Sequence, residues 1–349
     1  MSKNLKDNNS LILEFLKANP SVSSGEIYAG IEVKLGYATL KRTLHKLISA
    51  NLIIFNGKGK GTKYLISPAY ELIRFIDEEM YFKKEIDERN IKESYNHSLI
   101  TDTLSKVSVF TNDELNILNN LQNIYKENIS KLTYLEYKKE LERLAIDLSW
   151  KSSQIEGNTY SLLETERLLR EKETASGKTK EEAIMLLNHK DALDFIIENP
   201  TYVSPLTISG IEDIHSILIK ELYVDRNIRR RRVGISGTNY KPLDNEFQIR
   251  EALENMCALV NKEKNVFAKA LLALVLLSYI QAFNDGNKRT ARIISNAILM
   301  NNNCCPISFR TINSIDYKKA MLIFYEQNNI SAFKKIFISQ FEFAVKTYF

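Results

Sequence analysis

The chain has 349 residues, of which 44% are hydrophobic, and this is enough for two or three domains with buried cores. Its three cysteines, Cys257, Cys304 and Cys305, match neither metal-ligand spacing nor a disulfide framework, which favours a reducing cytoplasm. No basic-then-apolar leader opens the chain, and its longest apolar run, residues 266–280, is shorter than the roughly twenty residues of a membrane span. We therefore expect a cytoplasmic protein with no membrane partner.

The net charge of +5 is unevenly distributed. Residues 1–66 contain ten lysines and arginines against four acidic residues, so this segment carries six surplus positive charges and the remainder is close to neutral. Such a concentration of charge predicts a polyanionic partner for the N-terminal unit alone.

Residues 1–68 are expected to form one small domain. Apolar spacing predicts helices over 11–18, 23–31 and 37–49, and two apolar strands flank a loop of glycines and lysines at 56–62. This order resembles a winged helix-turn-helix module, whose third helix enters a DNA groove while the loop forms the wing. The resemblance implies DNA binding by Lys41, Arg42, Lys46, Lys58 and Lys60. A protein-interaction domain with a solvated basic face is the alternative.

Residues 69–149 are charged and mostly helical in period, and they predict a helical extension or spacer without chemistry of its own. A short pattern from Ser152 to Asn158 follows. Gly157 and Asn158 end a helix, which places Glu156 in the last turn, where the dipole disfavours a carboxylate unless it meets a cation. Taken alone, this pattern is equally well explained by an ordinary capped helix.

Four consecutive arginines, residues 229–232, precede a segment in which β-branched residues alternate with small ones. Together with the turn residues that follow, the alternation predicts a β-hairpin. Its residues are Val233, Gly234, Ile235, Ser236, Gly237 and Thr238. The arginines form either a solvated patch or a group beside a nucleotide or an acidic target, and no single one of them is assigned a role.

The most informative segment is a polar loop between the apolar run 266–280 and an amphipathic stretch that ends at Met300. Gly286 and Asn287 open the second helix, so free backbone N–H groups and the helix dipole favour an anion there. Arg289 and Arg292 lie three residues apart on one face, and Asp285 offers a hard oxygen ligand for a divalent cation. The pattern predicts a phosphate and magnesium site. The alternative is a helix start capped by Asp285 with two solvated arginines.

This loop and helix resemble the motif of Fic-domain proteins, His-x-Phe-x-Asp/Glu-Gly-Asn-x-Arg-x-x-Arg. The positions that match are Phe283, Asp285, Gly286, Asn287, Arg289 and Arg292. The resemblance implies a mainly α fold with a Fic helical core over 150–310, a small β-hairpin flap, and C-terminal helices over 311–349. It also implies ATP and Mg²⁺ as cofactors and AMP transfer from ATP to a hydroxyl of a protein target, the chain itself included.

The resemblance assigns roles to individual positions. Asp285, Asn287 and Arg289 would act in catalysis with the residue at 281, and Asp285 would hold the metal. The nucleotide would be bound by Gly286, Asn287, Lys288, Arg289 and Arg292. Ser152, Glu156 and Gly157 match the family's inhibitory helix, whose glutamate pairs with the second arginine, here Arg292. Residues 233–238 would be the flap that holds the target by strand addition.

One departure from the motif concerns the general base, because Gln281 occupies the position of the family's histidine. An amide side chain cannot carry a proton near neutral pH, and general-base catalysis contributes about 10²–10⁴-fold. We therefore expect an autoinhibited adenylyltransferase with impaired chemistry. The alternatives are a catalytically silent ATP-binding regulator coupled to DNA binding, and a DNA-binding protein that uses the fold as a scaffold. A phosphoryl-transfer variant has no residue in its favour, and the oligomeric state, a homo-oligomer included, stays open.

Overall fold

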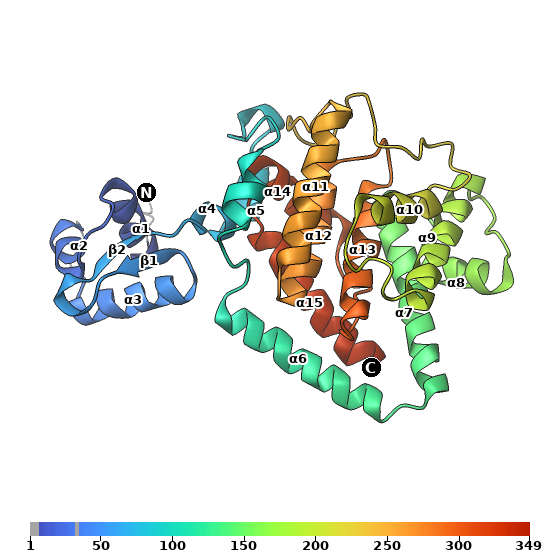
Figure 1. Cartoon of the computed structure of the whole chain (residues 1–349), viewed down its shortest axis with the longest axis horizontal. Helices are drawn as coiled ribbons and strands as arrows, with labels where there is room; N and C mark the ends of the chain where they lie inside the picture. The colour runs from blue at the N-terminus through green and yellow to red at the C-terminus, as the bar shows by residue number, and fades with distance from the viewer. Residues whose placement is uncertain (1–6, 32–34) are drawn as a thin grey trace.

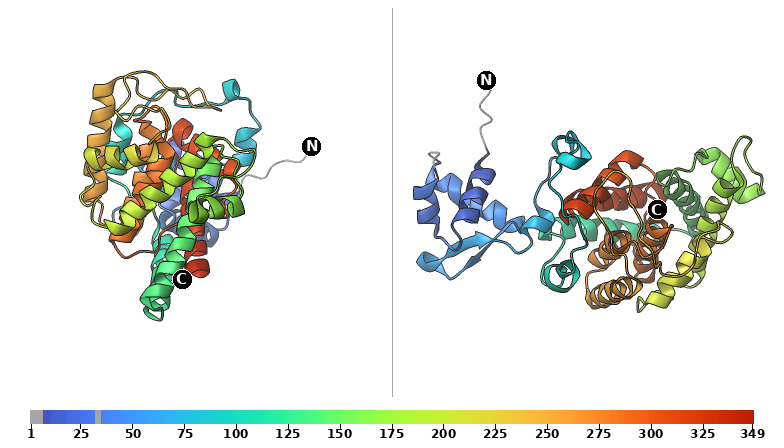
Figure 2. Two further views of the ribbon diagram at one scale, coloured as in Figure 1. Left: turned by 90° about the vertical axis from the view of Figure 1, so that its right-hand side faces the viewer. Right: turned by 90° about the horizontal axis from the view of Figure 1, so that it is seen from above.

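The structure is a computed structural model that describes residues 7–31 and 35–349. Residues 1–6 and 32–34, which include Lys3, Lys6 and Lys34 of the basic segment, lie outside the described residues. The fold is mainly helical, as the sequence predicts. An N-terminal unit is joined by one connection to a larger helical body (Figures 1 and 2).

The N-terminal unit has three helices and one hairpin. Its elements are α1 (Asn8–Ala18), α2 (Ser24–Gly30), α3 (Tyr37–Ser49), β1 (Ile53–Asn56), a 3₁₀ turn (Gly59–Gly61) and β2 (Lys63–Ile66). The strands are antiparallel, with Ile53 opposite Ile66 and Asn56 opposite Lys63. Ser23 and Glu26 form a reciprocal capping box that starts α2. The apolar faces meet in a core of their own, formed by Ile12, Leu16, Ile27, Leu40, Leu44, Leu47, Ile53 and Tyr64.

In the connection and the larger body, the regular elements longer than a single bridge are all helical among the described residues. The connection contains α4 (Tyr70–Ile73), α5 (Glu78–Phe82), a 3₁₀ turn (Ile86–Glu88) and a π-helical turn (Leu99–Leu104). The body contains α6 (Asn112–Ser130), α7 (Tyr134–Ile155), α8 (Leu162–Glu171), α9 (Lys180–Glu198), α10 (Ile208–Leu218), α11 (Glu246–Lys262), α12 (Val266–Ile280), α13 (Asn287–Asn301), α14 (Ser314–Gln327) and α15 (Ser331–Tyr348). The boundary expected at 149/150 therefore falls inside α7.

Helix α12 is the centre of the body, in contact with α11, α13, α14 and α15 (Figure 1). Almost every side chain of α12 is buried, which explains its all-round apolar sequence. The polar loop 281–286 connects its C-terminus to the start of α13. No helix among the described residues has the length and apolar character needed to cross a membrane.

The expected β-hairpin at residues 233–238 is not formed, and this prediction was wrong. Residues 233–240, called the flap loop below, turn at 236–237 without any strand or ladder hydrogen bond. Gly234 and Gly237 weaken the strand propensity of the segment. Contacts from distant residues fix it instead: Arg89 donates to the Gly237 carbonyl at 2.9 Å, and the N–H of Lys241 donates to the Glu93 carbonyl at 2.7 Å.

Candidate active site

The loop between α12 and α13 has a backbone fixed by its own side chains. Asn287 bonds both polar groups of Phe283: the Phe283 N–H donates to Oδ1 at 2.8 Å, and Nδ2 donates to the carbonyl at 2.7 Å. Gly286, the residue before α13, has a φ of 81°, and a Cβ there would lie 3.3 Å from His215 and Ile219. Only glycine suits this position, for conformation and for space alike.

The first turn of α13 faces a pocket. No side chain caps this N-terminus, and Gly286, Asn287 and Lys288 line a cavity of about 370 Å³. An uncapped helix N-terminus directs N–H groups and the positive end of the dipole into that space, which is the arrangement that binds phosphate. Glu156, the flap loop and α14 close the other sides.

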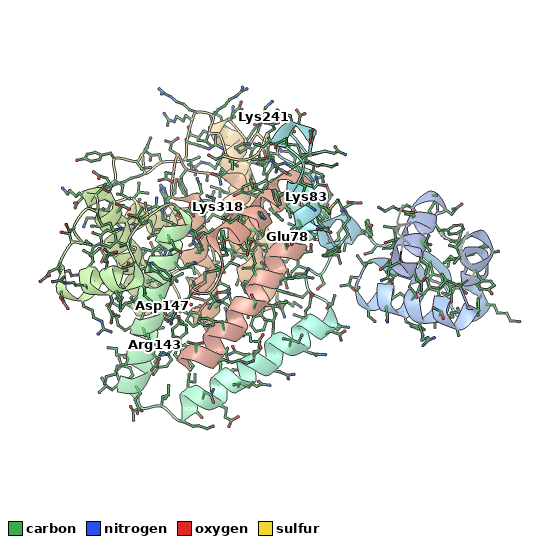
Figure 3. All side chains as sticks on the ribbon, turned by 180° about the vertical axis from the view of Figure 1, so that it is seen from behind. Glu78, Lys83, Arg143, Asp147, Lys241 and Lys318 are labelled. Atoms are coloured by element: carbon green, nitrogen blue, oxygen red, sulfur yellow. The ribbon has the colours of Figure 1, made fainter. Side chains whose placement is uncertain are left out.

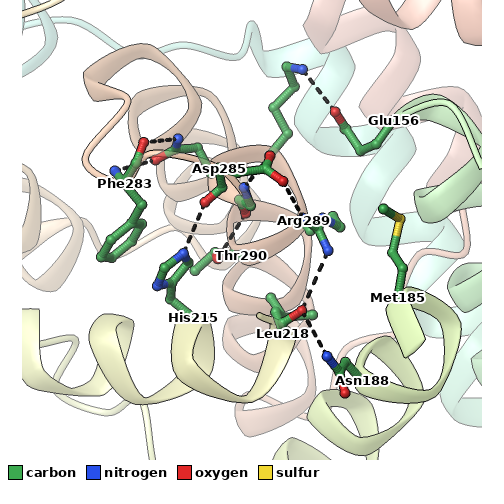
Figure 4. A network of polar contacts seen from close by, with 12 residues as sticks. Glu156, Met185, Asn188, His215, Leu218, Phe283, Asp285, Arg289 and Thr290 are labelled. Atoms are coloured by element: carbon green, nitrogen blue, oxygen red, sulfur yellow. Dashed lines mark hydrogen bonds and ion pairs between the residues drawn. The ribbon is translucent and has the colours of Figure 1, made fainter. Parts of the chain in front are cut away.

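Two arginines lie beneath this turn. Arg289 is 1% exposed; its Nη2 lies 3.0 Å from Oδ2 of Asp285, and its Nη1 donates to the Leu218 carbonyl (Figure 4). Asp285 is the exposed member of the pair, and its Oδ1 accepts from the Gly286 N–H at 2.6 Å. Arg289 Nε and Arg292 Nη1 are buried without a partner among the described residues. Unpartnered guanidinium donors below an open helix end add to the attraction for an anion.

The end of α7 lies over these cations. Oε1 of Glu156 is 2.7 Å from Nη2 of Arg292, and Oε2 is 2.9 Å from Nζ of Lys288. Arg292 also donates to Oγ and to the carbonyl of Ser152, at 2.8 and 3.0 Å. Gly157, with a φ of 105°, turns the chain directly after Glu156. The structure thus brings together the residues of the two patterns that lie well over a hundred positions apart in the sequence.

The charge of Glu156 depends on its neighbours. Burial alone raises the pKa of this carboxyl group, but Arg292 and Lys288 outweigh it and hold the pKa at about 2. Glu156 is therefore an anion at neutral pH and occupies part of the hydrogen-bonding capacity of Arg292.

Gln281 is buried at the end of α12 in the left-handed conformation, with a φ of 53°. Its Nε2 donates to the Ser278 carbonyl at 2.6 Å and lies 3.4 Å from the hydroxyl of Tyr325, while its Oε1 accepts from Asn287 at 3.3 Å. Its carbonyl accepts from Nε of Arg229 at 2.6 Å. The side chain lines the pocket, but its amide donor is directed at backbone.

The two histidines near the loop, His215 and His189, are both buried. His215 stacks on Phe283 with 3.6 Å between ring centroids, and its Nε2 lies 2.9 Å from the Asp285 carbonyl. Burial lowers the pKa of His215 to about 4, so the ring is neutral, and the carbonyl acceptor requires the proton on Nε2. His189 is fully buried, and burial together with Arg292 lowers its pKa well below the usual value. His215 supports the loop, and no pattern in the sequence predicts this role.

The four arginines before the flap loop have different surroundings. Arg229 is buried, and each of its three guanidinium nitrogens donates to a backbone carbonyl, those of Gln281, Arg231 and Leu243. Arg230 and Arg232 are exposed and pair with Glu246 and Asp244 at 2.7 and 2.6 Å. Arg229 thus fixes the backbone at Gln281, whereas Arg230 and Arg232 form ion pairs on the surface.

Helix α14 supplies a pocket wall that sequence reasoning missed. Lys318, Met321, Leu322 and Tyr325 line the cavity, at the i, i+3, i+4, i+7 spacing of one helix face. That spacing is visible in the sequence, but it is also the ordinary signature of a core-facing helix, so it does not point to a site. Lys318 is labelled in Figure 3, which views the whole molecule from behind.

A larger cavity of about 1020 Å³ lies between α7, α8 and α9, and it is distant from the loop. Its charged side chains mostly pair with one another, as Arg143 does with Glu140 at 2.6 Å and Arg310 with Asp147 at 3.1 Å (Figure 3). The smaller pocket is the better candidate, because the open N-terminus of α13 lines it and two buried arginines, each with one guanidinium nitrogen that has no partner among the described residues, lie beneath that helix end.

The residues expected to contact DNA lie on one unit. Arg42 and Lys46 are exposed on α3, and Lys58 and Lys60 are exposed on the connection between β1 and β2. Lys41 is half-buried, with its Nζ 5.6 and 5.8 Å from the ring centroids of Tyr37 and Tyr64. Its charge is therefore partly engaged with aromatic faces.

Comparison with known proteins agrees with this geometry. Residues 205–299 match the model of the Fic/DOC family. The chain is similar to a protein adenylyltransferase Fic of Nematostella vectensis, with 28% identity over 52% of this chain and 44% of the relative. It is also similar to the protein adenylyltransferase fic-1 of Caenorhabditis elegans, with 27% identity over 44% of this chain and 31% of the relative. The chain thus spans less than half the length of these curated relatives.

Two solved structures share the fold. The structure of residues 134–508 of Fic-1 from C. elegans superposes with a TM-score of 0.58 at 20% identity, over 68% of this chain and 72% of that one. A Fic domain containing signaling protein from Bacteroides thetaiotaomicron gives a TM-score of 0.56 at 20% identity, over 66% of this chain and 94% of that one. At such identities the likeness concerns the fold. With the family match over α10 to α13, it follows that this chain contains a Fic/DOC domain.

Proposed function

We propose that this protein is a Fic-type adenylyltransferase that transfers AMP from ATP to a protein hydroxyl, and that it is restrained by Glu156 and weakened by Gln281. The observation that carries the proposal is the open N-terminus of α13, which faces a pocket above two buried arginines. The relatives named protein adenylyltransferase support the same chemistry.

The reaction forms one bond and breaks another. The hydroxyl oxygen of the target attacks the α-phosphorus of ATP, the bond to the bridging oxygen breaks, and pyrophosphate leaves. The N–H groups at Gly286–Lys288 and the guanidinium of Arg289 would hold the phosphates and stabilise the charge that develops on them. The hydroxyl proton must leave as the new bond forms. The amide of Gln281 stands where a base is needed and cannot accept that proton.

A magnesium ion fits the residues present. Mg²⁺ is usually held by one or two carboxylates together with substrate phosphates, and Asp285 presents an exposed carboxylate at the edge of the pocket. The described residues contain no cluster of three metal-ligating side chains, so the nucleotide itself would supply the remaining ligands. Bound there, the ion would neutralise phosphate charge during transfer.

Glu156 supports the autoinhibition. Its carboxylate is ionised and bonded to Arg292 and Lys288, so a phosphate approaching these cations meets a negative charge already in place. ATP would bind in a non-productive pose, or weakly, until α7 shifts or Glu156 is removed.

Labelled ATP provides the test. Incubation with α-labelled and γ-labelled ATP separates the outcomes: AMP transfer leaves the α-label on protein, and phosphoryl transfer leaves the γ-label. We expect faint α-labelling of the natural sequence and strong α-labelling after Glu156→Gly together with Gln281→His. The absence of any label in the double variant would overturn the proposal.

The second candidate is a silent regulator that reports ATP binding to the winged helix-turn-helix unit. The observation that favours it is the side chain of Gln281, which is buried and bonded to the Ser278 carbonyl. Under this reading, ATP binds to the natural sequence and changes its affinity for DNA, while no label is transferred by any variant at position 281. The affinity of the chain for DNA, measured with and without ATP and Mg²⁺, distinguishes the two.

A further inference from the structure

Residues 85–94, called the brace below, lie between α5 and the π-helical turn and run along the second half of the flap loop. Arg89 Nη2 donates to the Gly237 carbonyl at 2.9 Å, and Asn239 Nδ2 donates to Asp87 Oδ1 at 2.7 Å. The N–H of Lys241 donates to the Glu93 carbonyl at 2.7 Å, next to a parallel bridge between Ser94 and Lys241. Figure 3 labels Lys83, which precedes the brace, and Lys241, which follows the flap loop. The brace, rather than a hairpin partner, therefore fixes this half of the loop.

Arg89 is the buried member of the brace, at 8% exposure. Its Nη1 donates to both carboxylate oxygens of Glu326, at 3.0 and 3.2 Å, and Glu326 is 1% exposed. Tyr81 donates to the same carboxylate at 2.6 Å. A buried ion pair of this kind adds little net stability, because desolvation offsets the attraction, but it fixes geometry. The planar guanidinium reaches a carboxylate and a carbonyl at once, which the single ammonium of lysine does not.

The ion pair connects the flap loop to the pocket wall. Glu326 follows Tyr325 on α14, and the Tyr325 hydroxyl lies 3.4 Å from Nε2 of Gln281. Through Arg89, the turn of the flap loop is thus fixed relative to the helix that lines the pocket at position 281.

The first half of the flap loop is free along its backbone. Among the described residues, no hydrogen bond is made by the backbone of residues 233–236. Both ends of this stretch are fixed: the Arg231 carbonyl accepts from Arg229 at 2.8 Å, and the Gly237 carbonyl accepts from Arg89. Free N–H and C=O groups between two fixed ends can pair with an added strand.

We propose that Arg89 is a positioning residue that sets the flap loop at the distance and orientation needed to align a target segment over position 281. The proposal rests on the proposed function in its last step, since alignment matters only if a target hydroxyl reacts there. Its first step, that Arg89 orders the flap loop, concerns the free protein.

Hydrogen exchange of the full chain tests the first step. In Arg89→Lys, the amides of Tyr240 and Lys241, which donate to the Thr238 hydroxyl and the Glu93 carbonyl, should exchange faster than in the natural sequence, while those of α12 and α13 keep their protection. Arg74→Lys is the matched control: Arg74 lies in the same connection and bonds Gln327 at the end of α14, at 3.2 Å, but does not touch the flap loop. Equal exchange in the loop of Arg89→Lys and the natural sequence, or equal loosening by Arg74→Lys, overturns the proposal.

Activity tests the second step, in chains that also carry Glu156→Gly and Gln281→His. Adding Arg89→Lys should lower the maximal rate of self-labelling by about tenfold, as expected for one charged hydrogen bond. The Kd for ATP with Mg²⁺, measured by calorimetry, should stay unchanged, because Arg89 does not line the pocket. If Arg89→Lys weakens ATP binding as much as it lowers the labelling rate, Arg89 has a merely structural role and does not position the flap loop. If the double variant itself is never labelled, the proposed function fails, and hydrogen exchange still decides whether Arg89 orders the loop.

Discussion

Glu156 and Arg292 form an ion pair of 2.7 Å across 136 residues of sequence, and the guanidinium is completely buried. The pair joins the end of α7 to the first turns of α13, and Glu156 lines the pocket. Under the proposed function, this contact is what restrains nucleotide binding.

Glu156→Gly should tighten the binding of ATP with Mg²⁺ by about tenfold or more, because charged hydrogen bonds of Arg292 and Lys288 then become free for phosphate. Calorimetry of the full chain measures the Kd. Glu142→Gly is the control, since Glu142 lies on the same helix and pairs with Lys190 at 3.0 Å, away from the pocket. Equal affinities together with equal α-labelling for the natural sequence and Glu156→Gly would contradict autoinhibition.

The ion pair should also make stability depend on pH. The pKa of Glu156 is about 2 in the folded chain against an ordinary 4.5, so the unfolded state binds this proton more tightly. The contribution, on the order of 1–3 kcal/mol, is therefore complete above about pH 5 and is lost as the pH falls toward 2. Urea unfolding should show that Glu156→Gln lowers the free energy of unfolding more near pH 6 than near pH 3. A difference that does not change with pH would show that the pair is not coupled to folding.

The sequence predicted the local parts of this architecture well. Helix α3 has the bounds expected from its apolar spacing, Tyr37–Ser49, and the order of α12, loop and α13 follows from an apolar run broken by Gly286 and Asn287. Such features depend on neighbours in the chain, which is why periodicity and turn residues reveal them.

The parts that failed or were missed depend on long-range contacts. The flap loop has the alternation of a hairpin, but Arg89 and Glu93 fix it from more than a hundred residues away. His215 supports Asp285 from α10 without any pattern around it. The wall provided by α14 resembles any core-facing helix in sequence. Only the fold brings these residues to the motif.

His215→Phe tests the support beneath the loop. Phenylalanine keeps the stacking on Phe283 but loses the hydrogen bond to the Asp285 carbonyl. The pKa of His215 is lowered to about 4, so its contribution is complete above the unfolded value of 6.5 and is lost as the pH falls toward 4. The free energy of unfolding should therefore differ most between the two chains near pH 7, and the difference should shrink near pH 4. A difference that grows on acidification would refute the assigned tautomer and contact.

The N-terminal unit should bind duplex DNA in a salt-dependent way. Arg42→Ala with Lys46→Ala removes two exposed cations from α3, so the slope of log affinity against log salt should fall by about two. Fluorescence anisotropy of the full chain on a labelled duplex measures this slope. Lys138→Ala with Lys139→Ala removes two exposed lysines from α7 and serves as the control. If both double variants behave like the natural sequence, or no binding occurs at low salt, the basic face does not contact DNA.

Restoring a base at position 281 is the most direct test of the chemistry. Residue 281 has a φ of 53°, a conformation that histidine and asparagine adopt more readily than most residues, and Arg229 fixes its carbonyl. In chains that carry Glu156→Gly, Gln281→His should therefore increase α-label incorporation by about 10²–10⁴-fold.

The matched variant is Gln281→Asn, which suits the same backbone but, like glutamine, cannot accept a proton. It should label no better than Glu156→Gly alone, so that the difference between the two variants reports the base and not the backbone. Equal labelling of the histidine and asparagine variants would mean that the hydroxyl proton leaves by another route. If ATP binds to all of these chains and none is labelled, the pocket reports nucleotide occupancy without transferring AMP, and the regulator is the function that survives.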